Sequence, residues 1–169
     1  MTKTVIIING RGGVGKDTLC NFAARCFRVR NVSSITPIKE IAAMHGWHGE
    51  KDERARRFLW LLKTAFTEYC DLPTRYLMEQ YRLFSEGEEE ILFAHIREAD
   101  QISHFRESVT KAGGRCLTLL VRRGEVSLYG NDADDGVENY PYDLIYENRL
   151  SLEQAPQDFC RFLKTALDS

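Results

Sequence analysis

The sequence predicts a three-layer α/β domain, in which helices cover both faces of a five-stranded parallel sheet. Short apolar runs alternate with segments of helical periodicity along the chain, as in Val5–Ile8, Ile91–Ala94 and Cys116–Val121. The runs are largely continuous rather than alternating, which is typical of strands buried on both faces of a parallel sheet. At 169 residues the chain has the length of one domain, so we treat 1–169 as a single unit.

The first half of the chain contains two predicted strands and a long helical region. We expect a strand at about 4–8, a helix that ends near residue 28, and a second strand at 31–35. Three helical stretches then follow within 37–90, and Pro73 suits the first turn of the third. The second stretch repeats apolar residues at i, i+3, i+4, which predicts a buried face made of Ala55, Phe58, Leu59, Leu62, Phe66 and Tyr69.

The second half returns to a regular alternation. Its predicted elements are, in order, a strand at 91–94, a helix around 102–109, a strand at 116–121, a polar segment at 122–141, a strand at 143–146 and a helix from Ser151 onward. Gly113-Gly114 is expected to end the first of these helices. Ser151 and Gln154 have the spacing of a capping box, which places Leu152 on the buried face of the last helix.

Two excursions interrupt the alternation. The core comprises 1–36, 91–121 and 142–169, whereas 37–90 forms a helical insert and 122–141 a short polar segment. Ligands of open α/β sheets bind beyond the carboxyl ends of the strands, where both excursions emerge. The sequence therefore predicts that the insert and the polar segment flank the functional site.

Composition excludes several classes of function. The formal net charge is −2, so no overall attraction to nucleic acid or to an acidic membrane surface is expected. The N-terminal apolar run is too short for a signal peptide or a membrane span. The cysteines are odd in number and never in C-x-x-C spacing, which favours reduced thiols and a cytoplasmic protein; they are Cys20, Cys26, Cys70, Cys116 and Cys160.

A glycine-rich turn follows the first predicted strand directly. Residues 10–18 read GRGGVGKDT, which has the spacing of the phosphate-binding P-loop (Walker A motif) with aspartate at its last position. Glycines let the chain wrap closely around an anion, and the next helix directs its N-terminal N–H groups to the same place. We therefore predict a nucleoside triphosphate site made of Gly10, Arg11, Gly12, Gly13, Val14, Gly15, Lys16, Asp17 and Thr18.

The order of motifs resembles the nucleoside monophosphate kinase group of P-loop kinases. It is most similar to the phage-type deoxynucleoside monophosphate kinases and to the animal phosphomevalonate kinases, which share nearly the same skeleton. The segments that carry the resemblance are Gly15–Thr18, Thr36–Glu40, Phe58–Thr64, His95–Ile102 and Tyr142–Asn148. The resemblance implies the P-loop NTPase fold, with 37–90 as an acceptor-binding insert and 122–141 as a lid.

The same resemblance implies phosphoryl transfer from ATP, with Mg²⁺, to a small phosphorylated acceptor. It implies catalytic roles for Lys16, Arg97 and Arg123, and an acceptor-phosphate pocket that includes Lys39, Arg97 and one or both of Arg57 and Lys63. Either Arg122 or Arg123 would stack on the base of ATP while the other contacts its phosphates. A nucleoside or deoxynucleoside monophosphate is the leading acceptor. A phosphomevalonate-like or dephospho-coenzyme A-like acceptor is the alternative.

Two positions depart from the usual pattern. Asp17 replaces the hydroxyl residue that ordinarily binds magnesium, and its carboxylate can lie beside a triphosphate only with a cation between them, so we predict Asp17 as a magnesium ligand. His95 stands where relatives carry an aspartate after the third strand. Asp17 would then hold the metal alone, or Glu98 would substitute, or the chain is an impaired kinase that binds nucleotide without turnover.

Overall fold

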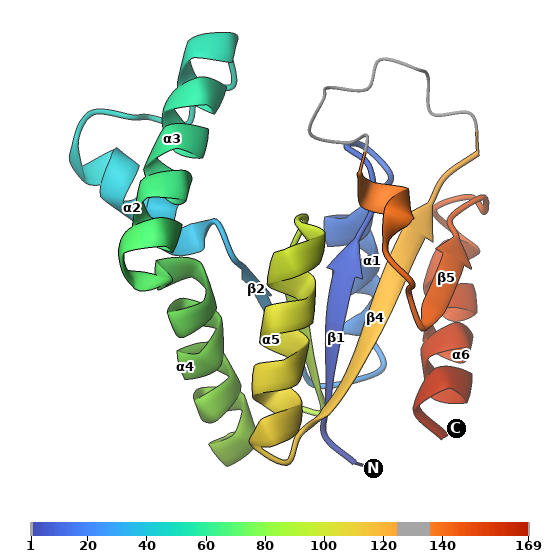
Figure 1. Ribbon diagram of the computed structural model, residues 1–169. Helices are drawn as coiled ribbons and strands as arrows, with labels where there is room; N and C mark the ends of the chain where they lie inside the picture. The colour runs from blue at the N-terminus through green and yellow to red at the C-terminus, as the bar shows by residue number, and fades with distance from the viewer. Residues whose placement is uncertain (1, 125–135, 169) are drawn as a thin grey trace.

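The computed structural model describes residues 2–124 and 136–168. Within these residues one sheet is formed by β1 (Thr4–Asn9), β2 (Val29–Ser33), β3 (Ile91–His95), β4 (Arg115–Arg122) and β5 (Leu144–Glu147), in the order β2-β3-β1-β4-β5. Every neighbouring pair is parallel. The predicted five-stranded parallel sheet is therefore confirmed, and all carboxyl ends of the strands point to the top of Figure 1.

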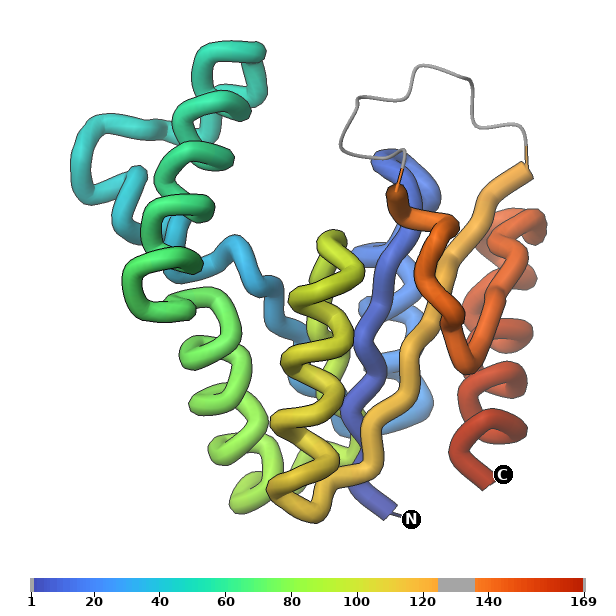
Figure 2. The backbone as a smooth tube through the Cα atoms, viewed as in Figure 1, coloured from blue at the N-terminus to red at the C-terminus, as the bar shows by residue number. Residues whose placement is uncertain are grey.

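The helices connect the strands and cover the sheet on both faces (Figures 1 and 2). They are α1 (Lys16–Ala23), α2 (Thr36–Met44), α3 (Glu53–Cys70), α4 (Leu72–Glu86), α5 (Ala99–Lys111) and α6 (Ala155–Asp168), with a short 3₁₀ turn η2 at Val137–Asn139. Between β2 and β3 the chain forms α2, α3 and α4, and α3 lies farther from the sheet than α4 or α5 (Figure 1).

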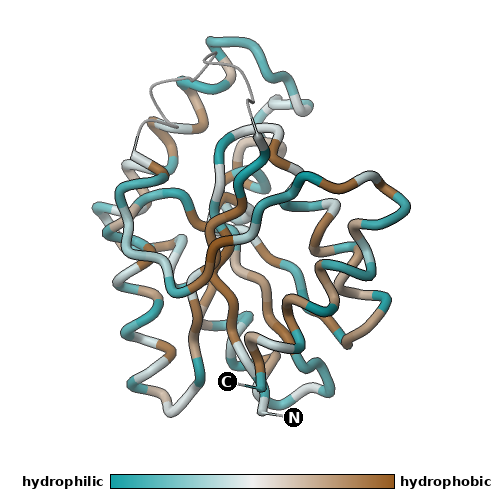
Figure 3. The backbone as a smooth tube through the Cα atoms, turned by 90° about the vertical axis from the view of Figure 1, so that its right-hand side faces the viewer, coloured by the Kyte–Doolittle hydropathy of each residue, from teal (hydrophilic) through white to brown (hydrophobic). Residues whose placement is uncertain are grey.

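Two hydrophobic clusters, one on each face of the sheet, make the three layers. Alternate residues of β1 separate between them: Ile6 and Ile8 face α1 and α6, whereas Val5 and Ile7 face α4 and α5. All four side chains are fully buried. Figure 3 shows the corresponding hydrophobic stretches running through the centre of the molecule. A central parallel strand buried on both faces explains why its sequence is a continuous apolar run.

Three expectations about the helices are wrong in detail. Helix α1 ends at Ala23, five residues before the predicted end. Helix α6 begins at Ala155, because the carbonyl of Ser151 accepts backbone N–H bonds in a preceding turn, and Leu152 is consequently exposed. Helix α3 is present, but Ala55 is its only buried residue among those described, so the expected buried face made with Phe58, Leu59, Leu62, Phe66 and Tyr69 is wrong.

The cysteines also depart from the prediction. Cys26, after the end of α1, forms a disulfide with Cys160 on α6, so the expectation that all thiols are reduced is wrong for this pair. Cys20, Cys70 and Cys116 are free. The disulfide joins the segment after α1 to α6, and both helices pack on the same face of the sheet. Among the described helices, none is both long and apolar enough to cross a membrane.

Candidate functional site

The glycine-rich turn between β1 and α1 packs against the ends of neighbouring strands. A β-carbon on Gly10 would lie 2.5 Å from the carbonyl oxygen of Val121 in β4, so no larger residue fits there without a shift of backbone. Gly15 has φ 91°, a left-handed conformation, and caps α1. These two positions explain why the turn requires glycine, since one lies against β4 and the other starts the helix.

The segment after β5 fixes the other side of the turn. The amide Nδ2 of Asn148 donates to the carbonyl of Val14 at 2.9 Å, and the backbone N–H of Asn148 donates to the carbonyl of Arg122 at 2.7 Å. One residue thus holds both the turn and the end of β4. Sequence reasoning placed Asn148 only within a resembling segment and gave it no role.

Asn9 connects the start of the turn to two other segments. Its Oδ1 accepts from the N–H of Gly10 at 2.9 Å, and its Nδ2 donates to the carbonyl of Arg97 at 3.1 Å and to the hydroxyl of Tyr142 at 2.8 Å. The hydroxyl of Tyr142 in turn donates to the carbonyl of Val137. Asn9 is buried, so this network sets where Arg97 leaves β3 relative to the turn. Sequence reasoning did not select Asn9, although a polar residue directly after the apolar run Val5–Ile8 could have pointed to it.

Lys16 folds back over the turn. Its Nζ donates to the carbonyl of Gly10 at 2.5 Å and to the carbonyl of Arg11 at 3.1 Å. Its charge is therefore already located above the concave side of the turn, at the N-terminus of α1, where an anion would bind. Asp17 and Thr18 follow in the first turn of α1, and both are exposed.

His95, at the end of β3, lies next to Asp17. The distance from His95 Nε2 to Asp17 Oδ1 is 3.8 Å, and Nε2 donates to Asn31 Oδ1 at 2.8 Å. Burial lowers the pKa of His95, and the nearby Asp17 carboxylate only partly opposes this effect. His95 is therefore neutral at pH 7, with its Nε2 proton directed at Asn31. Cys20 lies on the same side, 3.7 Å from Nε2, and burial raises the pKa of its thiol.

The insert reaches the same edge of the sheet through Lys63. Lys63 on α3 forms an ion pair with both carboxylate oxygens of Glu98 at 2.7 Å, and Glu98 directly precedes α5. Glu98 is thus engaged by Lys63 rather than placed beside Asp17. Arg97 is exposed next to it. Lys39 and Arg57 are exposed too, and in the described part of the chain neither side chain has a hydrogen bond or an ion pair.

Two buried polar atoms near the insert have no hydrogen-bond partner among the described residues. They are Oγ1 of Thr74 in the first turn of α4 and Oε1 of Gln101 in the first turn of α5. Buried polar atoms are almost always paired, so an unpaired one calls for an explanation. Sequence reasoning did not select either residue.

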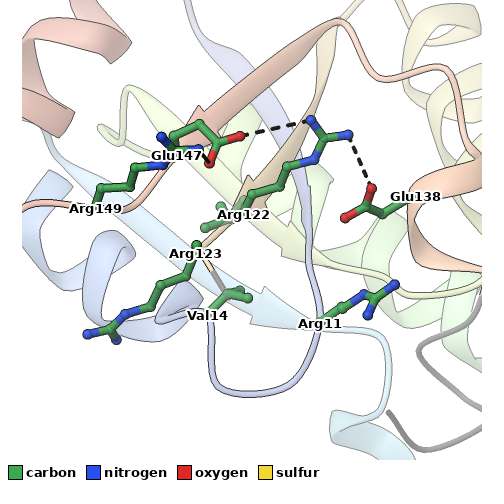
Figure 4. Close-up of a pocket in the computed structure, with 9 residues that line it drawn as sticks. Arg11, Val14, Arg122, Arg123, Glu138, Glu147 and Arg149 are labelled. Carbon is green, nitrogen blue, oxygen red and sulfur yellow. Dashed lines mark hydrogen bonds and ion pairs between the residues drawn. The ribbon is translucent and has the colours of Figure 1, made fainter. Parts of the chain in front are cut away.

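A cavity of about 370 Å³ lies between the glycine-rich turn and the ends of β4 and β5. Its lining comes from the turn, the end of β4 and the segments around η2 and β5: Arg11, Val14, Val121, Arg122, Arg123, Gly124, Glu138, Glu147 and Arg149. Figure 4 shows Arg122 reaching between Glu138 and Glu147, at 3.2 and 3.9 Å, whereas Arg123 points in another direction. Arg149 also pairs with Glu147. The glutamates and Arg149 were not predicted.

Part of the predicted site falls outside the described residues. Of the expected lid, 122–141, the structure describes 122–124 and 136–141, so the lid itself is not tested. Among the described residues, no group of three or more His, Cys, Asp or Glu side chains is arranged to hold a metal ion.

Comparison with known proteins identifies the fold. No protein-family model and no curated protein sequence matches the chain. Solved structures do match. The Mycobacterium tuberculosis APS kinase CysC in complex with AMPPNP and APS is 13% identical, with a TM-score of 0.58 over 96% of this chain and 98% of that chain. The shikimate kinase of Aquifex aeolicus is 11% identical, with a TM-score of 0.58 over 97% and 96%. This chain has the fold of the small P-loop kinases.

A solved structure that is not named as a kinase also matches the chain. The tunicamycin resistance protein of Deinococcus radiodurans is 10% identical, with a TM-score of 0.59 over 95% of each chain. The matched structures span nearly the whole chain. No kinase subgroup is distinguished at these identities, and a shared fold leaves the acceptor open.

Proposed function

We propose that the protein transfers the γ-phosphoryl group of ATP to a small monophosphate, and we favour a nucleoside or deoxynucleoside monophosphate as the acceptor. One observation carries the proposal: the glycine-rich turn and the cationic residues Lys63 and Arg97 meet at the same edge of the sheet, beyond β1 and β3. A phosphate donor and a phosphate acceptor can therefore lie side by side. The structural relative that holds AMPPNP and APS together supports such a two-ligand arrangement.

On the donor side, the turn would hold the outer phosphates of ATP. Backbone N–H groups and the N-terminus of α1 supply positive potential there. The Lys16 ammonium would exchange its bonds to the carbonyls of Gly10 and Arg11 for bonds to phosphate oxygens. The cavity beside Val14 then receives the base and ribose, with Arg122 and Arg123 at its edge. Since carboxylates already hold Arg122, we assign the phosphate-contacting role to Arg123.

Magnesium fits this site as part of the nucleotide complex. The side chain of Asp17 is 89% exposed, so its carboxylate is open to a cation that also binds phosphate oxygens. Mg²⁺ in phosphoryl-transfer sites is commonly held by one or two carboxylates together with substrate phosphates and water, so one aspartate suffices. His95 directs its Nε2 proton at Asn31 and offers no lone pair there. When bound, the ion neutralises charge on the transferring oxygens.

On the acceptor side, Lys63 and Arg97 would bind the acceptor phosphate, with Lys39 as a further cation of the insert. Arg57, which the sequence offered as an alternative, lies about 120° around α3 from Lys63 and is not assigned to the site. One oxygen of that phosphate forms a bond to the γ-phosphorus as the bond from this phosphorus to the β,γ-bridging oxygen breaks, and ADP leaves. Fixed cations stabilise the charge spread over the transferring group, so alignment and electrostatics supply the catalysis. Glu98 competes with the acceptor for Lys63.

The order of motifs shared with nucleoside monophosphate kinases favours a nucleotide acceptor. Oε1 of Gln101 and Oγ1 of Thr74 lack partners within the described structure, but both atoms are buried and do not bear on the choice of acceptor. One observation supports a second function, a nucleotide-binding module without turnover, because His95 leaves Asp17 without an adjacent carboxylate.

An acceptor panel distinguishes these functions. ADP release is measured with ATP, Mg²⁺ and each common nucleoside and deoxynucleoside monophosphate, with phosphomevalonate and dephospho-coenzyme A included. We expect release with at least one nucleotide, loss of it in Lys16→Ala, and no change in Lys164→Ala, which removes an exposed lysine of α6. Arg97→Ala should reduce turnover far more than ATP affinity. ATP binding without release for any acceptor would favour the binding module.

A further inference from the structure

The outer side of α3 carries an apolar stripe that is substantially exposed. The stripe consists of Phe58, Leu61, Ala65 and Tyr69. Phe58 is 40% exposed, Leu61 49% and Tyr69 89%, and Ala65 is exposed as well. At about 100° per residue, these residues occupy an arc of about 80°. Isolated apolar residues on a surface need no explanation, but an aligned set of four on one helix indicates a contact surface.

The stripe faces away from the proposed active site. Lys63 reaches Glu98 at the edge of the sheet and so defines the side of α3 that is turned toward the site. On the helix, Lys63 lies about 140° from Phe58 and about 160° from Ala65, on the opposite side of the axis. Helix α3 also lies farther from the sheet than α4 and α5 (Figure 2). The stripe is therefore available without covering the cleft.

Charged residues beside the stripe are separated by sign along the helix. Arg54 and Arg57 lie near the N-terminal end of α3, and Glu68 lies near its C-terminal end. All three are exposed, and none forms an ion pair within the described part of the chain. If two α3 helices packed antiparallel through this side, the arginines of one copy would lie near Glu68 of the other. A parallel pair would bring arginine against arginine.

We propose that the α3 stripe is the interface of a homodimer in which two α3 helices pack antiparallel around a two-fold axis. Centring the axis between Leu61 and Leu62 places Phe58 opposite the partner's Ala65, a large side chain against a small one. It also places Arg54 beside the partner's Tyr69. Arg57 then lies about 3 Å along the axis from the partner's Glu68, within reach of its long side chain. The face is self-complementary in size and in charge, which favours a second copy over another partner.

The dimer is expected to be weak and reversible. Helix α3 has 18 residues and is therefore about 27 Å long, so one helix pair gives an interface at or below the low end of stable complexes. Dissociation constants near the micromolar range are expected for such an interface. Both proposed active sites remain open because each faces away from the axis.

Sedimentation equilibrium of the whole chain at micromolar concentrations tests the proposal. The wild type should show a reversible monomer–dimer equilibrium. Leu61→Glu should be monomeric throughout, whereas Leu152→Glu, a matched change at an exposed leucine outside α3, should dimerise like the wild type. Circular dichroism should show equal helix content for both variants, because both side chains are substantially exposed. A wild type that stays monomeric, or a Leu61→Glu protein that dimerises normally, would overturn the proposal.

A charge exchange tests the antiparallel register. The antiparallel dimer contains two symmetry-related pairs of residue 57 with the partner's residue 68. Arg57→Glu alone makes both pairs negative, and Glu68→Arg alone makes both pairs positive. Each variant should therefore weaken association by about tenfold. Mixed together, the two variants restore opposite charges in both pairs. The mixture should therefore form heterodimers with nearly wild-type affinity. If mixing leaves both variants monomeric, the register is wrong.

Discussion

Gly15→Ala is the substitution for which the structure gives the most definite cost. Gly15 adopts φ 91°, where an L-residue is disfavoured by about 1–2 kcal/mol. A β-carbon there would lie 2.8 Å from Nδ2 of Asn148, so the amide must shift and its 2.9 Å hydrogen bond to Val14 is lost. Loss of that bond adds about 1 kcal/mol. We expect Gly15→Ala to lower the free energy of unfolding by about 2–3 kcal/mol.

Gly13→Ala is the matched control. Gly13 also has a positive φ, 79°, but a β-carbon there would meet no atom within 4 Å. It should therefore show only the conformational cost of about 1–2 kcal/mol. Urea unfolding of both variants, each also made in an Asn148→Ala background, measures the coupling. The difference between the two glycines should shrink once Asn148 is truncated. Equal costs at Gly13 and Gly15 would refute the assignment of Asn148 as the brace of the turn.

Three further predictions concern the disulfide, His95 and Asp17. Cys26→Ser should lower the free energy of unfolding by up to about 4–5 kcal/mol, because the disulfide closes a separation of 134 residues; wild-type unfolding that is insensitive to reductant would contradict this. The pKa of His95 is lowered by burial, so the unfolded chain takes up its proton first, and stability should fall as pH drops below about 6.5. Melting curves of His95→Gln across this range should show a smaller loss, and parallel curves would rule the effect out. Asp17→Asn should improve metal-free ATP binding and weaken its dependence on Mg²⁺; an unchanged dependence would place the metal elsewhere.

The sheet could be predicted because its signal is local. A continuous apolar run such as Val5–Ile8 can be satisfied only by burial on both faces, and the glycine-rich turn after it has a spacing that few other structures require. Alternation with helices then indicates that the strands run parallel, whereas the order β2-β3-β1-β4-β5 was not predicted. These features depend on neighbouring residues, so a single sequence contains them in full.

The errors arose where the answer depends on distant residues. The periodicity of Phe58 and Tyr69 correctly indicates a helix, but it does not say which side of that helix another element covers, and both side chains are exposed. The disulfide joins residues 134 apart, a pairing that spacing alone does not reveal. The contact between Asn148 and Val14 likewise forms only once β5 lies beside β4.

Positions within the site were predicted unevenly for the same reason. Lys16 and Asp17 belong to one short motif, so their placement at the turn follows from the sequence. The approach of His95 to Asp17 and the pairing of Lys63 with Glu98 depend on how β3 and the insert are packed. Glu98, which the sequence offered as a substitute metal ligand, is instead bound by Lys63.

The most direct test of the central proposal follows the γ-phosphoryl group itself. The protein is incubated with γ-³²P-labelled ATP, Mg²⁺ and the acceptor that gives the highest ADP release, and the products are separated. The label is expected in a nucleoside diphosphate formed from the acceptor, in amounts equal to the ADP produced, and neither product is expected with Lys16→Ala. Label that appears only as inorganic phosphate, or that stays in ATP with every acceptor, would contradict phosphoryl transfer as the function of this protein.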